Sequence, residues 1–267
     1  MTELIRIDGR GVETLRPITF ERAVSRYAEG SALVRWGNTH VLCTASVDEK
    51  VPPFMRGSGS GWITAEYSML PRATHQRSPR DISRGKQNAR GSEIQRLIGR
   101  SLRAAVDMTK LGERTVTIDC DVLQADGGTR TASITAGFIA LFDALRWLRV
   151  NERISAIPLK NQIAAVSVGK VAGTPMLDLC YEEDSTAEVD ANLVMTGAGD
   201  FIELQGTGEG GTFSYAELAQ IIDLGWSGIS EIHQKQREIL ALSEEERELF
   251  EKCRGSLRAQ TGENTAR

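Results

Sequence analysis

Residues 115–148 read TVTIDCDVLQADGGTRTASITAGFIALFDALRWL, and this stretch decides the kind of fold that the chain can form. From Thr115 to Val122 apolar and polar residues alternate, which is the period of a half-buried β-strand. From about Thr131 to Leu148 the apolar residues instead recur at helical spacing, with an inward row of Ile134, Phe138, Leu141 and Leu145. A strand that leads directly into an amphipathic helix indicates a mixed α and β protein.

The turn between these two elements is Asp126-Gly127-Gly128-Thr129-Arg130. Two glycines allow the backbone to direct its N–H groups toward one point, and the start of the helix adds unpaired N–H groups there. Thr129 can donate a hydroxyl, and Arg130 can bind an oxyanion through two parallel hydrogen bonds. The turn therefore predicts an anion site, with a plain turn that tolerates glycine for its shape as the alternative.

Further strand patterns lie on both sides of this stretch. Gly37-Asn38 is typical of a tight hairpin turn between two strand-like runs. The expected strands are Ser31 to Trp36, Thr39 to Val47, Ile163 to Val168, Met176 to Cys180, Leu193 to Thr196 and Phe201 to Gln205. With no long linker or internal repeat, we expect one α+β domain over residues 1–242. Residues 243–267 then form an acidic helix end and a mobile tail, because 255–267 have little to bury.

Three other helices are expected. Ser92 with Gln95 reads as a capping box, and the helix that follows places Arg96, Arg100 and Arg103 on one face. Ser214 with Glu217 reads as a second capping box. A last helix is expected from about Ile229 into the acidic stretch 244–251.

The net charge of -4 conceals two segments of opposite sign. Residues 72–103 contain only two acidic residues, Asp81 and Glu93, against nine basic ones: Arg72, Arg77, Arg80, Arg84, Lys86, Arg90, Arg96, Arg100 and Arg103. Residues 178–190 contain six carboxylates and no lysine or arginine. A basic stripe suits a polyanion and clustered carboxylates suit a hard divalent cation, while solvated charged faces remain the alternative.

Composition narrows the class of protein. The chain has 267 residues, of which 40% are hydrophobic and 25% charged, with a mean hydropathy of -0.25. No run approaches the roughly 18 apolar residues that cross a bilayer, and the N-terminus lacks a secretory apolar stretch. The four cysteines and three histidines are scattered, so neither a disulfide framework nor a zinc or histidine-rich metal site is expected. We expect a cytoplasmic protein.

Arg90 and the carboxylates add to the chemistry predicted at the turn. Arg90 lies two residues before the expected Ser92 cap, so two helix starts could meet at one phosphate. Asp184 and Asp190 flank Glu188 before an apolar strand, a spacing that lets two carboxylates share a Mg²⁺. Carboxylates beside an anion site would repel the anion, so a cation must lie between the two sites if they meet.

Residues 206–211, GTGEGG, satisfy the pattern GxGxxG of dinucleotide-binding loops. A dinucleotide-binding unit continues to a second parallel strand that ends in an acidic residue, whereas this chain runs through Trp226 into a polar helix. We interpret the loop as flexible backbone near a site or at a turn.

Over nearly its whole length the chain resembles the bacterial ribonuclease PH family of phosphorolytic, tRNA-trimming exoribonucleases. The motifs that carry the resemblance are GNTHVLCTASV, GWITAEYSMLPRAT, EIQRLIGRSLRA, DCDVLQADGGTRTASITAG, LDLCYEED and GTGEGGTFS. The resemblance implies a ribosomal protein S5 domain 2-like βαβα fold, also found in polynucleotide phosphorylase and exosome core subunits. It further implies a hexameric ring, built as a trimer of dimers, that trims tRNA precursors and other RNA 3′ ends, including ribosomal RNA, and releases nucleoside diphosphates.

The resemblance also implies roles for particular residues. Inorganic phosphate would be held by Arg90, Gly128, Thr129 and Arg130. Asp184 and Asp190 would be the metal and catalytic carboxylates, with Mg²⁺ as cofactor and Asp178 as a further candidate. RNA and subunit contacts would involve Arg72, Arg77 and Arg80, and RNA would also meet Arg96 and Arg100. Two alternatives are a catalytically silent RNA-binding ring subunit and a nicotinamide-dependent enzyme built on the loop at Gly206.

Overall fold

The computed structural model describes residues 6–80, 85 and 88–254 and contains two β-sheets. The first sheet has five strands in the order β1 (Ile18–Arg22), β2 (Gly30–Trp36), β3 (Thr39–Asp48), β5 (Thr115–Gln124) and β4 (Trp62–Met69). Its strands pair antiparallel except for β4 and β5, which are parallel. The hairpin expected at Gly37-Asn38 and the alternating strand from Thr115 are confirmed.

The second sheet is antiparallel throughout. Its order is β7 (Thr174–Leu177), β6 (Ile163–Val171), β8 (Val189–Thr196) and β9 (Phe201–Gly208). In this sheet Asp190 stands opposite Gly169 of β6 on one side and Thr207 of β9 on the other. The acidic segment that precedes β8 is thereby brought beside the end of β9.

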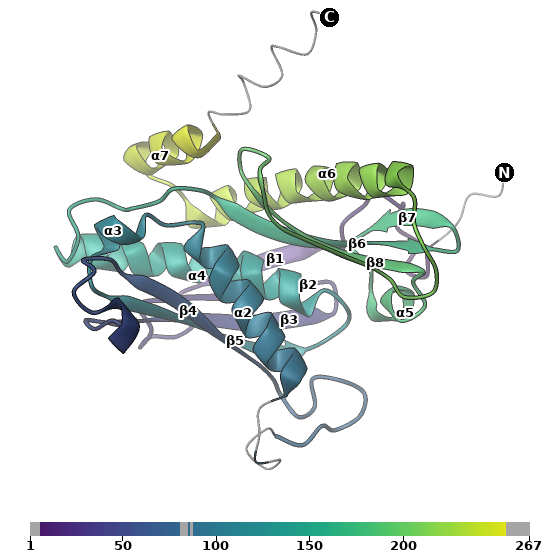
Figure 1. Cartoon of the computed structure of the whole chain (residues 1–267), viewed down its shortest axis with the longest axis horizontal. Coiled ribbons are helices and arrows are strands. Elements are labelled where there is room, and N and C mark those ends of the chain that lie inside the picture. The colour runs from purple at the N-terminus through teal and green to yellow at the C-terminus, as the bar shows by residue number, and fades with distance from the viewer. Residues whose placement is uncertain (1–5, 81–84, 86–87, 255–267) are drawn as a thin grey trace, which may run out of the picture.

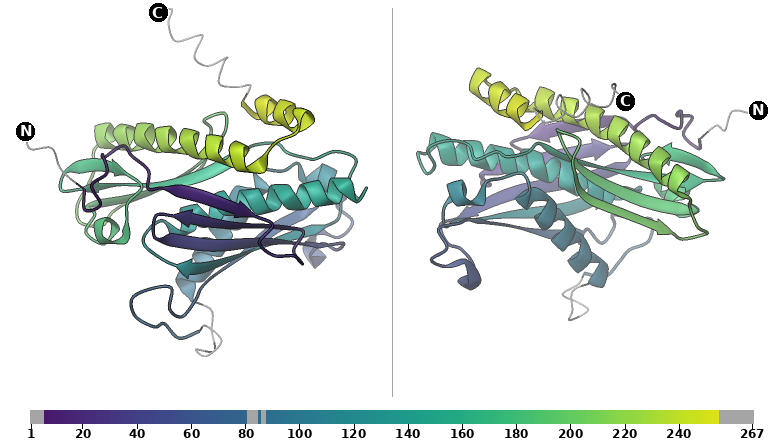
Figure 2. Two further views of the ribbon diagram at one scale, coloured as in Figure 1. Left: turned by 180° about the vertical axis from the view of Figure 1, so that it is seen from behind. Right: turned by 45° about the horizontal axis from the view of Figure 1, so that its top comes forward.

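The helices separate and cover the sheets (Figure 1). They are α2 (Ala89–Arg103), α3 (Met108–Leu111), α4 (Thr129–Val150), α5 (Tyr181–Asp184), α6 (Tyr215–Leu240) and α7 (Glu244–Arg254), with a short 3₁₀ helix at Pro53–Met55. Helices α2 and α4 pack on the first sheet, α4 also contacts the second sheet, and α6 lies along the outer side of the second sheet (Figure 2). The α+β class is confirmed.

Helix α4 is buried on nearly all sides because it lies between the two sheets. The expected inward row of Ile134, Phe138, Leu141 and Leu145 is buried, but so are most of the residues between them. By length and composition α4 could span a membrane, yet 83% of its most apolar window is buried inside the protein. One hydrophobic core continues from the first sheet through α4 to the second sheet.

The start of α2 and the presence of two strands differ from the sequence prediction. Helix α2 begins at Ala89, and its N-cap is Asn88, whose side chain accepts a hydrogen bond from the Arg90 N–H. Ser92 lies inside the first turn, where its N–H bonds the Asn88 carbonyl, so the predicted Ser92 cap is wrong. Strands β1 and β4 were not predicted, although apolar and polar residues alternate along most of β4.

The C-terminal part also differs. The capping box of Ser214 and Glu217 is confirmed, but α6 continues without a break to Leu240, so no separate helix begins at Ile229. The acidic stretch forms its own helix, α7, whose Phe250 ring packs edge-on against Phe142 at 5.1 Å. Residues 255–267, where a mobile tail was predicted, lie outside the described residues.

Candidate active site

The Gly127-Gly128 turn is the element around which the site is built. Both residues have positive φ, +74° at Gly127 and +66° at Gly128, and Gly128 is the N-cap of α4. A Cβ on Gly127 would lie 2.6 Å from the Leu179 carbonyl oxygen. Glycine is therefore required twice over, by backbone conformation and by the close approach of the segment that leads into α5.

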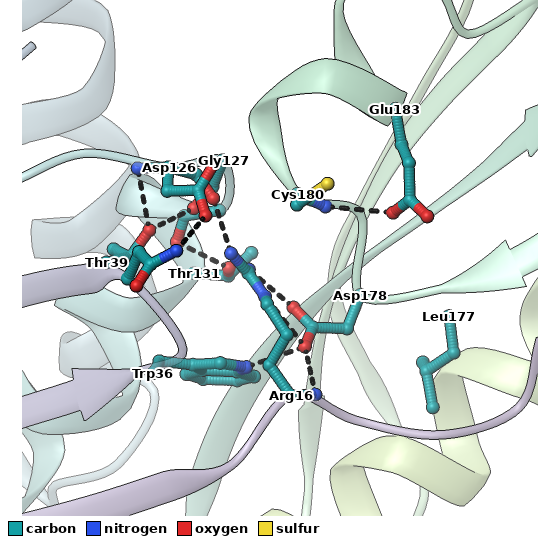
Figure 3. Close-up of polar contacts among 12 residues, drawn as sticks. Arg16, Trp36, Thr39, Asp126, Gly127, Thr131, Leu177, Asp178, Cys180 and Glu183 are labelled. Atoms are coloured by element: carbon teal, nitrogen blue, oxygen red, sulfur yellow. Dashed lines mark hydrogen bonds and ion pairs between the residues drawn. The ribbon is translucent and has the colours of Figure 1, made fainter. Parts of the chain in front are cut away.

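Asp178 locks that segment to the first sheet (Figure 3). Its Oδ1 accepts a 2.7 Å bond from Arg16 Nη2, and its Oδ2 accepts bonds from the Arg16 backbone N–H at 2.7 Å and from Trp36 Nε1 at 2.9 Å. The carboxylate is 1% exposed. Both carboxylate oxygens of Asp178 thus accept hydrogen bonds within the protein. This argues against Asp178 as a third metal ligand, the role that the resemblance suggested.

Asp126 and Thr39 join the turn to its neighbours (Figure 3). Asp126 accepts a bond from the Tyr181 backbone N–H at 3.1 Å and another from the Asn38 side chain at 3.3 Å. The Thr39 hydroxyl donates to the Gly127 carbonyl at 2.7 Å. The β2–β3 hairpin, the diglycine turn and the start of α5 are therefore held as one unit.

Glu183, the neighbour of Asp184 on α5, also has its carboxylate oxygens bound within the protein. Arg6 binds it with two hydrogen bonds, Nε to Oε1 at 2.9 Å and Nη2 to Oε2 at 2.6 Å, and both side chains are buried. Although burial opposes it, these bonds lower the pKa of Glu183. The carboxylate remains ionised in its ion pair and anchors the short helix that carries Asp184.

Asp184 and Asp190 are brought together by this arrangement. Burial, followed by the charge of Asp184, raises the pKa of Asp190 to about 6. Burial, followed by the charge of Glu209, raises the pKa of Asp184, while Arg90 and Arg130 oppose that rise. Asp184 lies within electrostatic reach of Asp190, Arg90 and Arg130, and Asp190 lies within reach of Arg130. The acidic and basic segments predicted from sequence therefore meet in space.

The cationic side of the site combines the starts of α2 and α4. Arg130, in the first turn of α4, bonds Gln205 of β9 at 3.1 Å and lies 3.9 Å from Glu93. Arg90 is exposed in the first turn of α2. The N–H groups at the start of α4 and two guanidinium groups therefore surround a place suited to an oxyanion.

The carboxylate pair also suits a divalent cation. No cluster of three metal-ligating side chains occurs among the residues that the structure describes. Mg²⁺ does not require one, because it is commonly bound by one or two carboxylates with waters and substrate phosphates as the other ligands. Burial is the largest cause of the raised pKa of each aspartate, and a neighbouring carboxylate adds to it; a bound cation would offset both effects.

The predicted RNA-binding arginines divide into two groups. Arg100 is paired with Glu203 of β9 through two bonds of 2.6 and 2.7 Å, whereas Arg96 is exposed on the same helix. The arginines that precede α2 are exposed on the loop that follows β4, namely Arg72, Arg77 and Arg80. Asp81, Arg84 and Lys86 lie outside the described ranges.

The GTGEGG loop has a different role from dinucleotide binding. Its first three residues, 206–208, end β9 at the edge of an antiparallel sheet, so the parallel strand–helix–strand unit of a nicotinamide site is not formed. A Cβ on Gly208 would lie 2.0 Å from the Gly211 carbonyl oxygen, which explains the glycine by shape. The loop instead places Glu209 near Asp184 and Asp190, which sequence reasoning missed.

Comparison with known proteins agrees with this geometry. Residues 14–146 match domain 1 of the 3′ exoribonuclease family and residues 161–228 match its domain 2. The chain is 54% identical over 237 residues to ribonuclease PH of Methylobacterium radiotolerans, covering 89% of this chain and 100% of the relative.

Two solved structures share the fold of this chain, and each is 23% identical to it in sequence. Rice (Oryza sativa) Rrp46 has a TM-score of 0.71 and covers 88% of this chain and 100% of its own. The Archaeoglobus fulgidus exosome with RNA bound to the active site has a TM-score of 0.73 and covers 86% of this chain and 92% of its own. The chain belongs to the 3′ exoribonuclease family, within its ribonuclease PH group.

Proposed function

We propose that this protein is a phosphate-dependent 3′-to-5′ exoribonuclease that trims the 3′ ends of tRNA precursors by phosphorolysis. The observation that carries the proposal is the meeting of the arginine-lined start of α4 with Asp184 and Asp190. A silent RNA-binding subunit would need neither the phosphate site nor the half-buried carboxylates. Family membership and the 54% identity to a ribonuclease PH support the same conclusion.

The reaction follows from the charges of the site. An oxygen of inorganic phosphate attacks the phosphorus of the last phosphodiester, the bond from that phosphorus to the 3′ oxygen breaks, and the 3′ oxygen takes up a proton. The terminal nucleotide leaves as a nucleoside diphosphate. Arg90, Arg130 and the N–H groups at the start of α4 orient the phosphate and offset the repulsion between the two anions. Because a phosphodiester is exchanged for a phosphoanhydride, the reaction runs backwards when nucleoside diphosphate is abundant.

We further propose that Asp184 and Asp190 hold a Mg²⁺ ion. When bound, the ion would neutralise charge on the phosphate groups. The protein's own contribution is to fix the two carboxylates, through the Arg6–Glu183 pair on α5 and the strand pairing of β8. We also propose a cytoplasmic location and a catalytic domain over residues 1–242.

The function is tested by incubating the protein with a short RNA, with and without inorganic phosphate, and identifying the released nucleotide. We expect nucleoside diphosphates only when phosphate is present, and lengthening of the RNA when nucleoside diphosphate is supplied instead. Release of nucleoside monophosphates without phosphate would show hydrolysis and contradict the proposal. Binding of RNA with no released nucleotide would favour the silent subunit.

The exposed arginine loop gives a second prediction, about assembly. We propose that Arg72, Arg77 and Arg80 take part in subunit contacts of a hexamer, a trimer of dimers, and in binding structured RNA, because all three are exposed on the loop that follows β4. Replacing all three with alanine should reduce the native mass in analytical sedimentation and weaken tRNA binding. An unchanged mass together with unchanged tRNA affinity would show that the loop has neither role.

A further inference from the structure

Two hydroxyl groups meet beneath the proposed phosphate site. The Tyr67 hydroxyl on β4 lies 2.8 Å from Oγ1 of Thr129, the first residue of α4. Tyr67 is 6% exposed and Thr129 is 8% exposed, so water is largely excluded from the pair. The first turn of α2 lies close to the backbone of β4 at this residue, since a Cβ on Gly91 would lie 3.7 Å from the Tyr67 carbonyl oxygen.

The two hydroxyl groups carry one hydrogen more than the bond between them requires. Each hydroxyl carries one hydrogen, and the single bond between them consumes only one. Within the described part of the chain, neither hydroxyl oxygen has another hydrogen-bond partner. One donor hydrogen therefore remains available in a nearly dry place, where an acceptor oxygen of a ligand can bind it.

The surrounding charges identify the class of that ligand. Arg90 and Arg130 both act on the Tyr67 hydroxyl, so the spare hydrogen lies in a region of positive potential. An acceptor that enters such a region is an anion with several oxygens. The neighbouring N–H groups at the start of α4 favour the same class of ligand.

We propose that Tyr67 is a positioning residue for phosphate: its hydroxyl donates to Thr129 Oγ1 and so directs the Thr129 hydrogen toward the bound anion. The inference rests on the function proposed above and adds a residue to its phosphate site. Burial raises the pKa of Tyr67, although the Thr129 bond and the two arginines oppose the rise. The phenol therefore keeps its hydrogen at neutral pH and remains able to donate.

The test is Tyr67→Phe, which removes the hydroxyl and keeps the ring in the core. The KM for inorganic phosphate should rise roughly tenfold, because the Thr129 hydroxyl that donates to the charged ligand is no longer held in its donating orientation. The turnover rate at saturating phosphate and the RNA affinity should stay unchanged. Tyr27→Phe is the control, because Tyr27 is 85% exposed and should leave all three quantities at wild-type values.

A double-mutant cycle separates positioning through Thr129 from a general effect on packing. In a Thr129→Val background, Tyr67→Phe should have no further effect on the phosphate KM, whereas in Thr129→Ser, which keeps the hydroxyl, the tenfold effect should persist. Full additivity in the valine background would overturn the inference. So would a normal phosphate KM in Tyr67→Phe alongside a raised one in Thr129→Val. If Thr129→Val and Arg130→Ala both left the phosphate KM unchanged, the proposed phosphate site itself would be wrong.

Discussion

Replacing Arg130 with alanine should reduce phosphorolysis by roughly two to three orders of magnitude at low phosphate. Arg130 is in the first turn of α4, and in the described residues its guanidinium is held in place by Gln205 at 3.1 Å and is only 3.9 Å from Glu93. Its removal takes away a charge-assisted oxyanion contact, worth about 2.7 to 4 kcal/mol by analogy with loss of an oxyanion-hole donor. Initial rates measured across a phosphate titration check this result.

Two comparisons make the Arg130 result specific. RNA affinity should be close to wild type, because the exposed Arg72, Arg77 and Arg96 are untouched. Arg130→Lys should recover only part of the loss, since lysine keeps the charge but not the two parallel hydrogen bonds. If Arg130→Ala kept a normal rate at low phosphate, the start of α4 would not be part of the phosphate site.

The β2–β3 hairpin, β5 and α4 were predictable because their signals are local. The Gly37-Asn38 hairpin and the diglycine turn are specified by residues that tolerate positive φ, and both form. The alternation before the turn also gave β5 to within a few residues. Helix α2 began earlier than predicted because Asn88 caps as well as Ser92 does, and residue type alone does not choose between them.

The meeting of the acidic and basic sites was not predictable from local pattern. It depends on contacts between residues far apart in the chain, such as Arg16 with Asp178 and Arg6 with Glu183. The same contacts distinguish Asp178 from Asp184, which look alike in sequence. Tyr67 also escaped notice, because an aromatic residue on the inward side of an alternating strand reads as core until its hydroxyl partner is known.

Replacing either Asp184 or Asp190 with asparagine should nearly abolish turnover, in both phosphorolysis and RNA synthesis. The same transition state serves both directions, so a group needed for one is needed for the other. We expect a loss of at least roughly a hundredfold, the usual scale for removing a catalytic acid, base or metal ligand. Rates in each direction, measured while Mg²⁺ is titrated, check this expectation.

Binding and stability measurements separate this active carboxylate pair from a merely acidic loop. Because the pKa of each aspartate is raised by burial and by neighbouring negative charge, Asp190→Asn relieves repulsion and should leave the fold intact or stabilise it in chelator. Its RNA affinity in chelator should be equal or tighter, and the stabilisation that Mg²⁺ gives the wild type should disappear. Asp178→Asn is the matched control: it leaves the buried Arg16 without its ion-pair partner and should cost about 3 to 5 kcal/mol of stability. Near-normal turnover in both Asp184→Asn and Asp190→Asn, with Mg²⁺ stabilisation retained, would contradict the metal site and leave the two aspartates as part of a merely acidic loop.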